Sequence, residues 1–315
     1  MTKSIIRIIA GFVSAFILLS LFGCLGSSGP AGGLKIVTTI FPAYDFTKQI
    51  VRDTATVTLL IPPGQNIHTY EPSAKDIITI SECNLFIYNG GESDAWVDEV
   101  LSSLDRPIPK LRMMDCVTTV YEDTLHVAEP EEGNPQKDEH VWTSPKNAIA
   151  IARGIRDAII SADHGTSYDY ETQCAELVEK LSKLDADFTA FFETVPNEKK
   201  LMIFGDRFPI IYFTNDYGIE HYAAFPGCAE DTEPSPGVIA YLVDKAKEKE
   251  ADTIWHVELS NTATAEMLCE NIGAEPAMFH SCHGVTAAEL EAGETYESLM
   301  RKNLETLRQR MEGEQ

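Results

Sequence analysis

The chain has 315 residues, of which 44% are hydrophobic and 23% are charged, and its formal net charge at pH 7 is −24. This length allows two domains with separate cores, and this composition is that of a globular protein rather than a disordered one. Because phosphate binding needs a basic face, the negative charge argues against nucleic acid as a partner. An acidic surface favours solubility and can also concentrate cations.

The first residues predict an export signal rather than part of the fold. Lys3 and Arg7 form a basic start, and an apolar run from Ile8 to Phe22 ends at Gly23-Cys24. This is the secretory pattern, and a Cys directly after the small residue resembles a bacterial lipoprotein signal. We expect residues 1–23 to be removed and Cys24 to be lipidated. An uncleaved membrane anchor is the alternative, and both interpretations place the rest of the chain outside the cytoplasm.

The next segment, residues 24–33, is rich in Gly and Ser and predicts a flexible tether. Strands then alternate with helices, which predicts a parallel sheet with helices on its faces. The expected strands are 34–40, 57–61, 85–88 and 111–114, and the expected helices are 44–51, 73–81 and 95–104. No GxGxxG follows the first strand, so a dinucleotide-binding fold is not supported.

A long helix is expected in the middle of the chain. An acidic loop over 129–139 precedes a helix that starts at Ser144-Pro145 and runs to about Ser161. From Asp169 to Thr194, apolar residues recur at steps of three and four, and Pro196 ends this pattern. A second set follows, with strands 200–204, 253–257 and 276–279 and helices 237–249, 263–271 and 296–311.

These patterns predict an α/β protein with two lobes, each with a mostly parallel sheet flanked by helices, joined by one long helix. The expected boundaries are 34–165 for the N-terminal lobe, 166–197 for the linking helix and 198–315 for the C-terminal lobe.

The cysteines leave their pairing open. Six remain besides Cys24, and an exported chain can form disulfides, but no CxxC is present. Cys228 and Cys282 both lie in expected loops and are the first candidate pair. Free, buried thiols are the alternative.

Two of the eight histidines have informative surroundings. His68 follows an expected strand and precedes a helix, and His140 stands just before the Ser144 helix start. Loops beyond the carboxyl ends of parallel strands are where such sheets bind ligands, so these two imidazoles could converge on a metal. A structural hydrogen-bonding role is the alternative for each. His126 borders the acidic loop and could scavenge cations, whereas the remaining weaker candidates, His164, His221 and His256, have no supporting context.

Four motifs follow one another in this order: Ile36-Val-Thr-Thr-Ile-Phe-Pro, Leu59-Leu-Ile-Pro-Pro-Gly with His68-Thr-Tyr-Glu-Pro, Leu85-Phe-Ile-Tyr-Asn-Gly, and His140-Val-Trp with Pro145-Lys-Asn-Ala. Together they resemble the solute-binding lipoproteins of zinc and manganese ABC importers, from about Leu34 to the C-terminus. The resemblance implies two α/β lobes joined by a rigid helix, with one metal held between them. It also implies that His68 and His140 are two of the metal ligands.

In the second lobe, the residues at the expected ligand positions differ from those that are typical of this family. Counting back from Tyr212-Phe213, Arg207 stands where the family has a His or Glu ligand, and arginine stays protonated without a free lone pair. Asp206 could take this place, or Asp206 and Arg207 could form a structural ion pair. After the last expected strand, His280 best matches the family's fourth ligand, and His283 is a further candidate.

Ligands His68, His140, His280 and Asp206 would favour tetrahedral Zn²⁺ over Mn²⁺, which prefers more oxygen. We therefore expect a monomer, anchored in membrane lipid through Cys24, that captures Zn²⁺ outside the cytoplasm and delivers it to the permease and ATPase of an ABC importer. A Mn²⁺-specific protein of the same type and a surface adhesin are the alternatives. An enzyme is not expected, because the sequence has no HExxH and no obvious general base beside His68 or His140.

Overall fold

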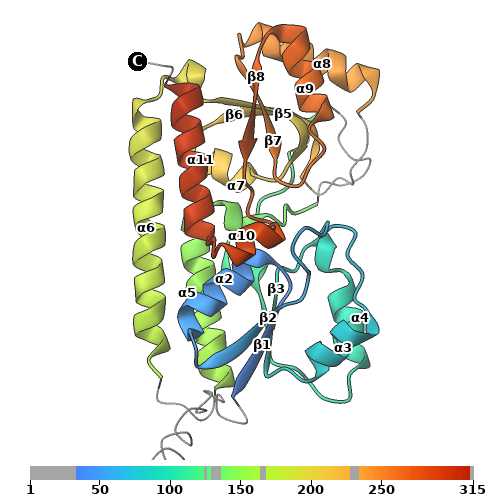
Figure 1. Ribbon diagram of the computed structural model, residues 1–315, viewed down its shortest axis with the longest axis vertical. Coiled ribbons are helices and arrows are strands. Elements are labelled where there is room, and N and C mark those ends of the chain that lie inside the picture. The colour runs from blue at the N-terminus through green and yellow to red at the C-terminus, as the bar shows by residue number, and fades with distance from the viewer. Residues whose placement is uncertain (1–32, 124–125, 129–135, 164–167, 228–233, 313–315) are drawn as a thin grey trace, which may run out of the picture. The chain divides into compact units, whose positions relative to one another are not determined.

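The computed structural model describes residues 33–123, 126–128, 136–163, 168–227 and 234–312. The expected leader, Cys24 and nearly all of the expected tether lie outside these residues. Figure 1 shows the arrangement of the helices and strands. Among the residues described, no helix combines the length and the apolar character that crossing a membrane requires.

The first lobe contains a parallel sheet with strand order β2-β1-β3-β4. Its strands are β1 (Leu34–Thr38), β2 (Ala55–Leu59), β3 (Leu85–Tyr88) and β4 (Lys110–Arg112). Its helices are α2 (Phe41–Val51), α3 (Ala74–Ser81), α4 (Trp96–Ser103) and α5 (Pro145–Ala162), with short 3₁₀ helices at Glu92–Asp94, Met113–Cys116 and Val141–Thr143.

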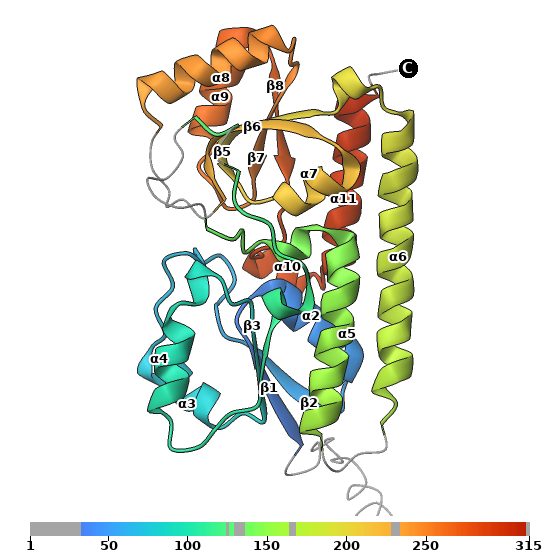
Figure 2. The same ribbon diagram turned by 180° about the vertical axis from the view of Figure 1, so that it is seen from behind.

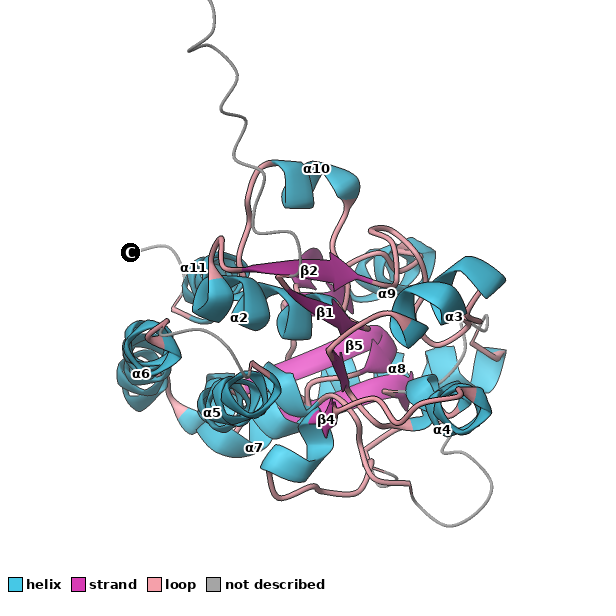
Figure 3. Ribbon diagram, turned by 90° about the horizontal axis from the view of Figure 1, so that it is seen from below, coloured by secondary structure: helices cyan, strands magenta, loops and turns pink. Residues whose placement is uncertain are grey.

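Side chains of this sheet are buried on both faces, as a parallel sheet between helices requires. Ile36 and Ile87 belong to the core formed with α2, α5 and α6, whereas Val37 and Phe86 belong to the core under α3 and α4. Figure 3 shows these two groups of helices on opposite sides of the strands.

The second lobe repeats this plan with strand order β6-β5-β7-β8, again parallel throughout. Its strands are β5 (Leu201–Phe208), β6 (Glu220–Pro226), β7 (Thr253–Val257) and β8 (Glu275–Phe279). Its helices are α7 (Ile211–Tyr217), α8 (Pro236–Glu248), α9 (Ala263–Ile272), α10 (Ala287–Glu291) and α11 (Tyr296–Met311), with a 3₁₀ helix at Asn197–Lys199.

The long helix α6 (Tyr170–Thr194) connects the two sheets. It begins after Asp169, whose side chain accepts from the backbone N–H of Thr172 at 3.0 Å. It packs against α2 and α5 of the first lobe and against α7 and α11 of the second, and it runs beside both sheets in Figures 1 and 2. Its buried stripe, including Leu181 and Phe188, belongs to one apolar core that contains strands of both sheets. The predicted fold class is therefore confirmed.

Three elements of the second lobe were not expected from the sequence. In β6, every residue from His221 to Pro226 is buried, so the strand has no alternation of apolar and polar residues. Helix α7 has only seven residues and no side-chain cap, so it lacks a start signal. Helix α10 has five residues. Strand β5 also extends to Phe208, beyond its expected end at residue 204, and so includes Asp206 and Arg207.

Candidate metal centre

Three histidine rings from distant parts of the chain meet between the lobes. His68 lies between β2 and α3, His140 directly precedes the 3₁₀ helix before α5, and His283 lies between β8 and α10. The ring centroids are 5.6 Å apart for His68 and His140, 4.9 Å for His68 and His283, and 5.0 Å for His140 and His283. His68 and His283 each follow the carboxyl end of a parallel strand, where such sheets bind ligands.

The nitrogen atoms of these rings are arranged as metal donors. His68, Glu139, His140 and His283 each offer a ligand atom, and these four atoms all lie within 4.8 Å of one another. The Nε2 atoms of His68, His140 and His283 are buried without a hydrogen-bond partner among the described residues. Buried polar atoms are normally hydrogen-bonded, so three such nitrogens in one place suit a cation.

The second nitrogen of two rings is held by an acidic neighbour. His68 Nδ1 lies 3.0 Å from Ser93 Oγ and 3.4 Å from Glu139 Oε1, and His140 Nδ1 lies 3.3 Å from Asp138 Oδ1. The Glu139 carboxylate also accepts from the Ser93 backbone N–H at 3.1 Å and from the Ser93 hydroxyl. Partners of this kind set the tautomer and the orientation of a metal-binding imidazole.

Two glycines permit the close packing around these side chains. A Cβ atom at Gly91 would overlap the Glu139 carboxylate. A Cβ atom at Gly227 would lie 3.0 Å from Cε1 of His140 and 2.9 Å from the Phe208 carbonyl oxygen. Larger residues at either position would therefore displace a group of the site.

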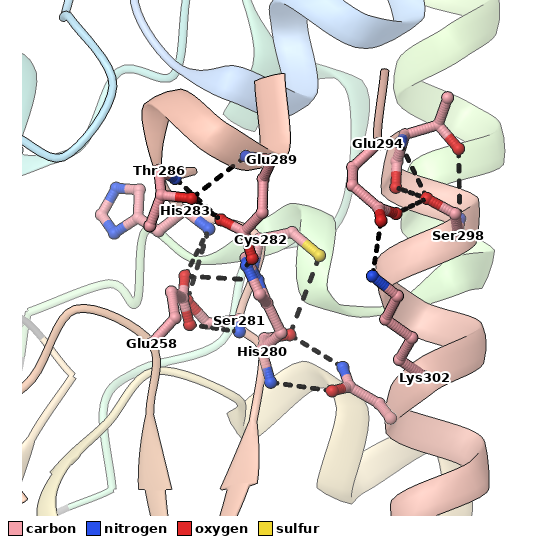
Figure 4. Close-up of polar contacts among 12 residues, drawn as sticks. Glu258, His280, Ser281, Cys282, His283, Thr286, Glu289, Glu294, Ser298 and Lys302 are labelled. Carbon is pink, nitrogen blue, oxygen red and sulfur yellow. Dashed lines mark hydrogen bonds and ion pairs between the residues drawn. The ribbon is translucent and has the colours of Figure 1, made fainter. Parts of the chain in front are cut away.

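The loop that carries His283 is bonded to both lobes. The Trp142 ring packs against the His283 ring, with centroids 4.7 Å apart, and Trp142 Nε1 donates to the Ser281 carbonyl at 2.9 Å. From the second lobe, Glu258 accepts from the His283 backbone N–H at 3.1 Å. Figure 4 shows Glu258 beside this loop.

Burial and nearby charges give the three imidazoles different proton affinities. Burial, followed by the charges of His140 and Arg207, lowers the pKa of His68 to about 2. Burial also lowers the pKa of His283 well below its usual value, helped by the other two rings and Arg207. For His140, burial lowers the pKa, but the adjacent Asp138 carboxylate and Glu139 more than offset it, so the pKa is raised. Two rings are therefore neutral and available to a metal at neutral pH.

A cleft of about 80 Å³ reaches His68 and His283. Arg207, Glu258 and residues 64–67 also line it. The Arg207 guanidinium thus stands beside the histidines as a positive charge, not as a donor.

The structure does not bring the other expected ligands, Asp206 and His280, into this group. Asp206 Oδ2 accepts from the Val257 backbone N–H at 3.1 Å, and burial raises the pKa of this carboxyl to about 7. His280 Nδ1 accepts from the Cys282 backbone N–H at 3.0 Å, and His280 Nε2 lies 3.5 Å from Glu289 Oε1. His283, the further candidate, is instead the second-lobe histidine that reaches His68 and His140.

Three residues that contact the buried histidines, Asp138, Glu139 and Ser93, had no role in the sequence analysis. Glu139 and Asp138 directly precede His140, and an acidic residue next to a candidate ligand is the signal that could have indicated them. Ser93 lies far from both in sequence, so its contact with His68 and Glu139 had no local signal.

A second group of donors lies at the β6 edge of the second sheet. His126 Nδ1 and His221 Nε2 each lie 2.7 Å from Oδ2 of Asp123. The backbone of residues 126–128 runs beside β6, where Ala128 N donates to the Ala223 carbonyl at 3.0 Å (Figure 2). No local pattern connects His126 with His221, and this long-range pairing brings them together.

Among the residues described, five cysteines carry free thiols: Cys83, Cys116, Cys174, Cys269 and Cys282. Cys282 is buried, and its expected partner Cys228 lies outside the described residues, as does His164.

Comparison with known proteins identifies the family of the chain. The family described as zinc-uptake complex component A, periplasmic, matches residues 36–310. The chain belongs to this family. The resemblance that the four motifs carry is therefore confirmed, and a member of this zinc-uptake family is a solute-binding protein rather than an enzyme.

Individual members of the zinc-uptake family are similar over most of the chain. The zinc-binding lipoprotein AdcA of Streptococcus pneumoniae strain R6 is 33% identical over 301 residues, which are 92% of this chain and 58% of that protein. The chain therefore spans little more than half the length of this relative. The high-affinity zinc uptake system protein ZnuA of Bacillus subtilis is 28% identical over 304 residues, 94% of each chain. The crystal structure of the Zn(II)-bound ZnuA-like domain of pneumococcal AdcA has a TM-score of 0.75 at 30% identity, covering 90% of this chain and 100% of that one.

Proposed function

We propose that this chain captures Zn²⁺ through the Nε2 atoms of His68, His140 and His283 and delivers it to an ABC importer. The observation that carries the proposal is the convergence of three buried Nε2 atoms that have no hydrogen-bond partner among the described residues. Membership in a family of zinc-uptake components supports it. Zinc is the cargo of such a site, and it is released to the importer rather than retained.

The donor chemistry favours zinc over manganese. Three imidazole nitrogens suit a tetrahedral Zn²⁺ ion, and a fourth donor from water or Glu139 would complete the tetrahedron. Mn²⁺ prefers a site richer in oxygen. In this proposal, Asp206 and His280 do not bind the ion, because neither offers an atom to the group of donors that lie within 4.8 Å of one another. Asp206 Oδ2 and His280 Nδ1 instead accept from backbone N–H groups of the second lobe.

The test is a competition titration of purified protein against a chromogenic zinc chelator, with elemental analysis of protein prepared without added metal. We expect one tightly bound zinc per chain and weaker binding of Mn²⁺. Wild-type affinity in both His68→Ala and His140→Ala would show that the site is elsewhere. Deletion of the gene should slow growth under zinc limitation, which separates uptake from adhesion.

We also propose that Cys24 is the lipid anchor, because the leader ends in a lipoprotein-like motif and the relative AdcA is named a lipoprotein. The protein would then act outside the cytoplasm, next to a membrane permease and its ATPase. Replacing Cys24 with Ser should release the protein from membranes or leave an unprocessed precursor. Unchanged lipid labelling of Cys24→Ser would refute this anchor.

A further inference from the structure

The segment that presents His283 has a backbone conformation that favours an anion. Cys282 has a φ of +60°, in the left-handed region that a residue with a side chain rarely adopts. Successive backbone N–H groups in such a turn point to one side and form a small concavity that binds negative charge. The N–H groups of Ser281 and His283 both point toward Glu258 (Figure 4).

The carboxylate of Glu258 fills this concavity. Its Oε2 accepts from the Ser281 backbone N–H at 2.6 Å, and its Oε1 accepts from the Ser281 hydroxyl at 2.7 Å and from the His283 backbone N–H at 3.1 Å. Glu258 is 8% exposed and directly follows β7, so its position is set by the sheet of the second lobe. Hydrogen bonds from neutral donors to a carboxylate are stronger than those to a neutral acceptor.

These contacts connect the second-lobe sheet to a metal donor. We infer that Glu258 is a positioning residue for His283: its carboxylate holds the Ser281–His283 turn so that the His283 Nε2 atom meets the donors of the first lobe. This inference rests on the proposed function of the three-histidine site. Glu258 acts through His283 and is not a ligand, since its oxygen atoms accept hydrogen bonds from the turn and do not belong to the group of donor atoms within 4.8 Å of one another.

Two residues of the turn have roles that agree with this assignment. The Ser281 hydroxyl donates to Glu258 and also lies 3.3 Å from the His283 backbone nitrogen, so it reinforces the same turn. His280 Nδ1 accepts from the Cys282 backbone N–H at 3.0 Å, so the N–H group between the two bound by Glu258 is also satisfied. All three N–H groups of the turn thus have a partner.

The experiment is a double-mutant cycle on zinc affinity with Glu258→Gln, His283→Ala and the combined variant. A Gln side chain has the size of Glu, but the two backbone N–H groups contact different oxygens of Glu258, so in Gln one of them would face an NH2 donor. We expect Glu258→Gln to weaken zinc binding by about 10–100-fold, the range for loss of a residue that orients a ligand. In the His283→Ala background, Glu258→Gln should alter zinc affinity by less than about threefold, because the imidazole that Glu258 positions is already absent.

Two controls accompany the cycle. Glu289→Gln removes a carboxylate that accepts from the Thr286 backbone N–H at 2.7 Å, three residues beyond His283, and should leave zinc affinity unchanged. If Glu258→Gln does not fold, as judged by its thermal unfolding without metal, Ser281→Ala replaces it in the cycle. We then expect a smaller loss of affinity that again disappears in the His283→Ala background.

Wild-type affinity in Glu258→Gln would overturn the inference, and so would an equal loss with and without His283, which would indicate a separate ligand or a general effect on folding. These outcomes are distinct from failure of the proposed function, which would appear as wild-type affinity in His283→Ala itself or as no zinc binding by the unmodified protein.

Discussion

Two clusters of histidine and acidic residues lie in this molecule, and they differ in what their nitrogen atoms contact. In the buried cluster, the Nε2 atoms of His68, His140 and His283 have no hydrogen-bond partner among the described residues, and their acidic neighbours contact the opposite nitrogen of two rings. In the edge cluster, one carboxylate oxygen of Asp123 contacts both imidazoles at 2.7 Å.

The burial of the two clusters differs as well. The side chain of His140 is 0% exposed, whereas in the edge cluster that of His126 is 44% exposed and that of His221 is 10% exposed. A solvated imidazole loses little when no metal is bound, but a buried unpartnered nitrogen carries a desolvation cost that a metal relieves. The feature that suits the buried cluster to a metal is therefore the convergence of three such nitrogens within 4.8 Å of one another, and not the presence of histidines alone.

The strongest test of this comparison is removal of donors. Changing His68, His140 or His283 to Ala should each weaken zinc binding by more than about 100-fold, because loss of a ligand exceeds the loss seen for residues that only orient ligands. The same substitution at His126 or His221 should leave the tight site unchanged. Chelator competition on all five variants measures the difference. Equal losses in the two clusters would contradict it.

The next-largest loss of zinc affinity is expected at the residues that contact the Nδ1 atoms of the ligand histidines. Asp138→Asn and Ser93→Ala should each weaken zinc binding by about 10–100-fold, because His140 loses the charge of its Nδ1 partner and His68 loses the nearest contact of its Nδ1 atom. Isothermal titration with zinc under a competing chelator gives these values. Affinities equal to that of the wild type would mean that the carboxylates and the hydroxyl do not orient the rings.

The dependence of zinc affinity on pH follows from the three pKa shifts. His68, with a pKa lowered to about 2, and His283, with a pKa lowered well below its usual value, stay neutral as the pH falls, whereas His140 has a raised pKa and becomes protonated. Protons then compete with zinc at one ring, so affinity should fall as the pH drops through the raised pKa of His140, by about tenfold per pH unit once the pH lies below that pKa. A fall of two or three orders of magnitude per unit would mean that several rings titrate, and no fall would exclude His140.

A smaller effect is expected at Arg207, which adds positive charge beside the buried cluster. Because Arg207 is half-buried and solvent screens part of its charge, Arg207→Ala should strengthen zinc binding by about tenfold or less. Chelator competition at low and at high salt measures this change, which salt should diminish. A loss as large as that in His68→Ala would assign Arg207 a structural role in the site.

The smallest effect on zinc is expected at the edge cluster. Asp123→Asn weakens the contacts to His126 and His221, which should cost about 1.5–3 kcal/mol of folding stability and lower the Tm by several degrees. Zinc affinity should not change. Thermal unfolding without metal and chelator competition are measured on the same sample, and a loss of bound zinc would show that this cluster also holds the ion.

Sequence patterns predicted most of the fold because its elements carry local signals. Helix α6 has an apolar stripe and a capping Asp169, and α5 begins with Ser144 as its cap followed by Pro145. The β6 strand and the short helix α7 lacked such signals, and their place depends on burial between other elements.

Of the candidate site, the sequence by itself determined that His68 and His140 stand in loops at the starts of helices, because strand, turn and cap signals act over a few residues. Only the tertiary structure decided which second-lobe side chain meets them. Over the four residues from His280 to His283, the direction of each side chain depends on the left-handed conformation of Cys282 and on the hydrogen bonds to Glu258, 25 residues earlier. Contacts between residues so far apart depend on the packing of β7 beside β8, which no local pattern in the sequence encodes.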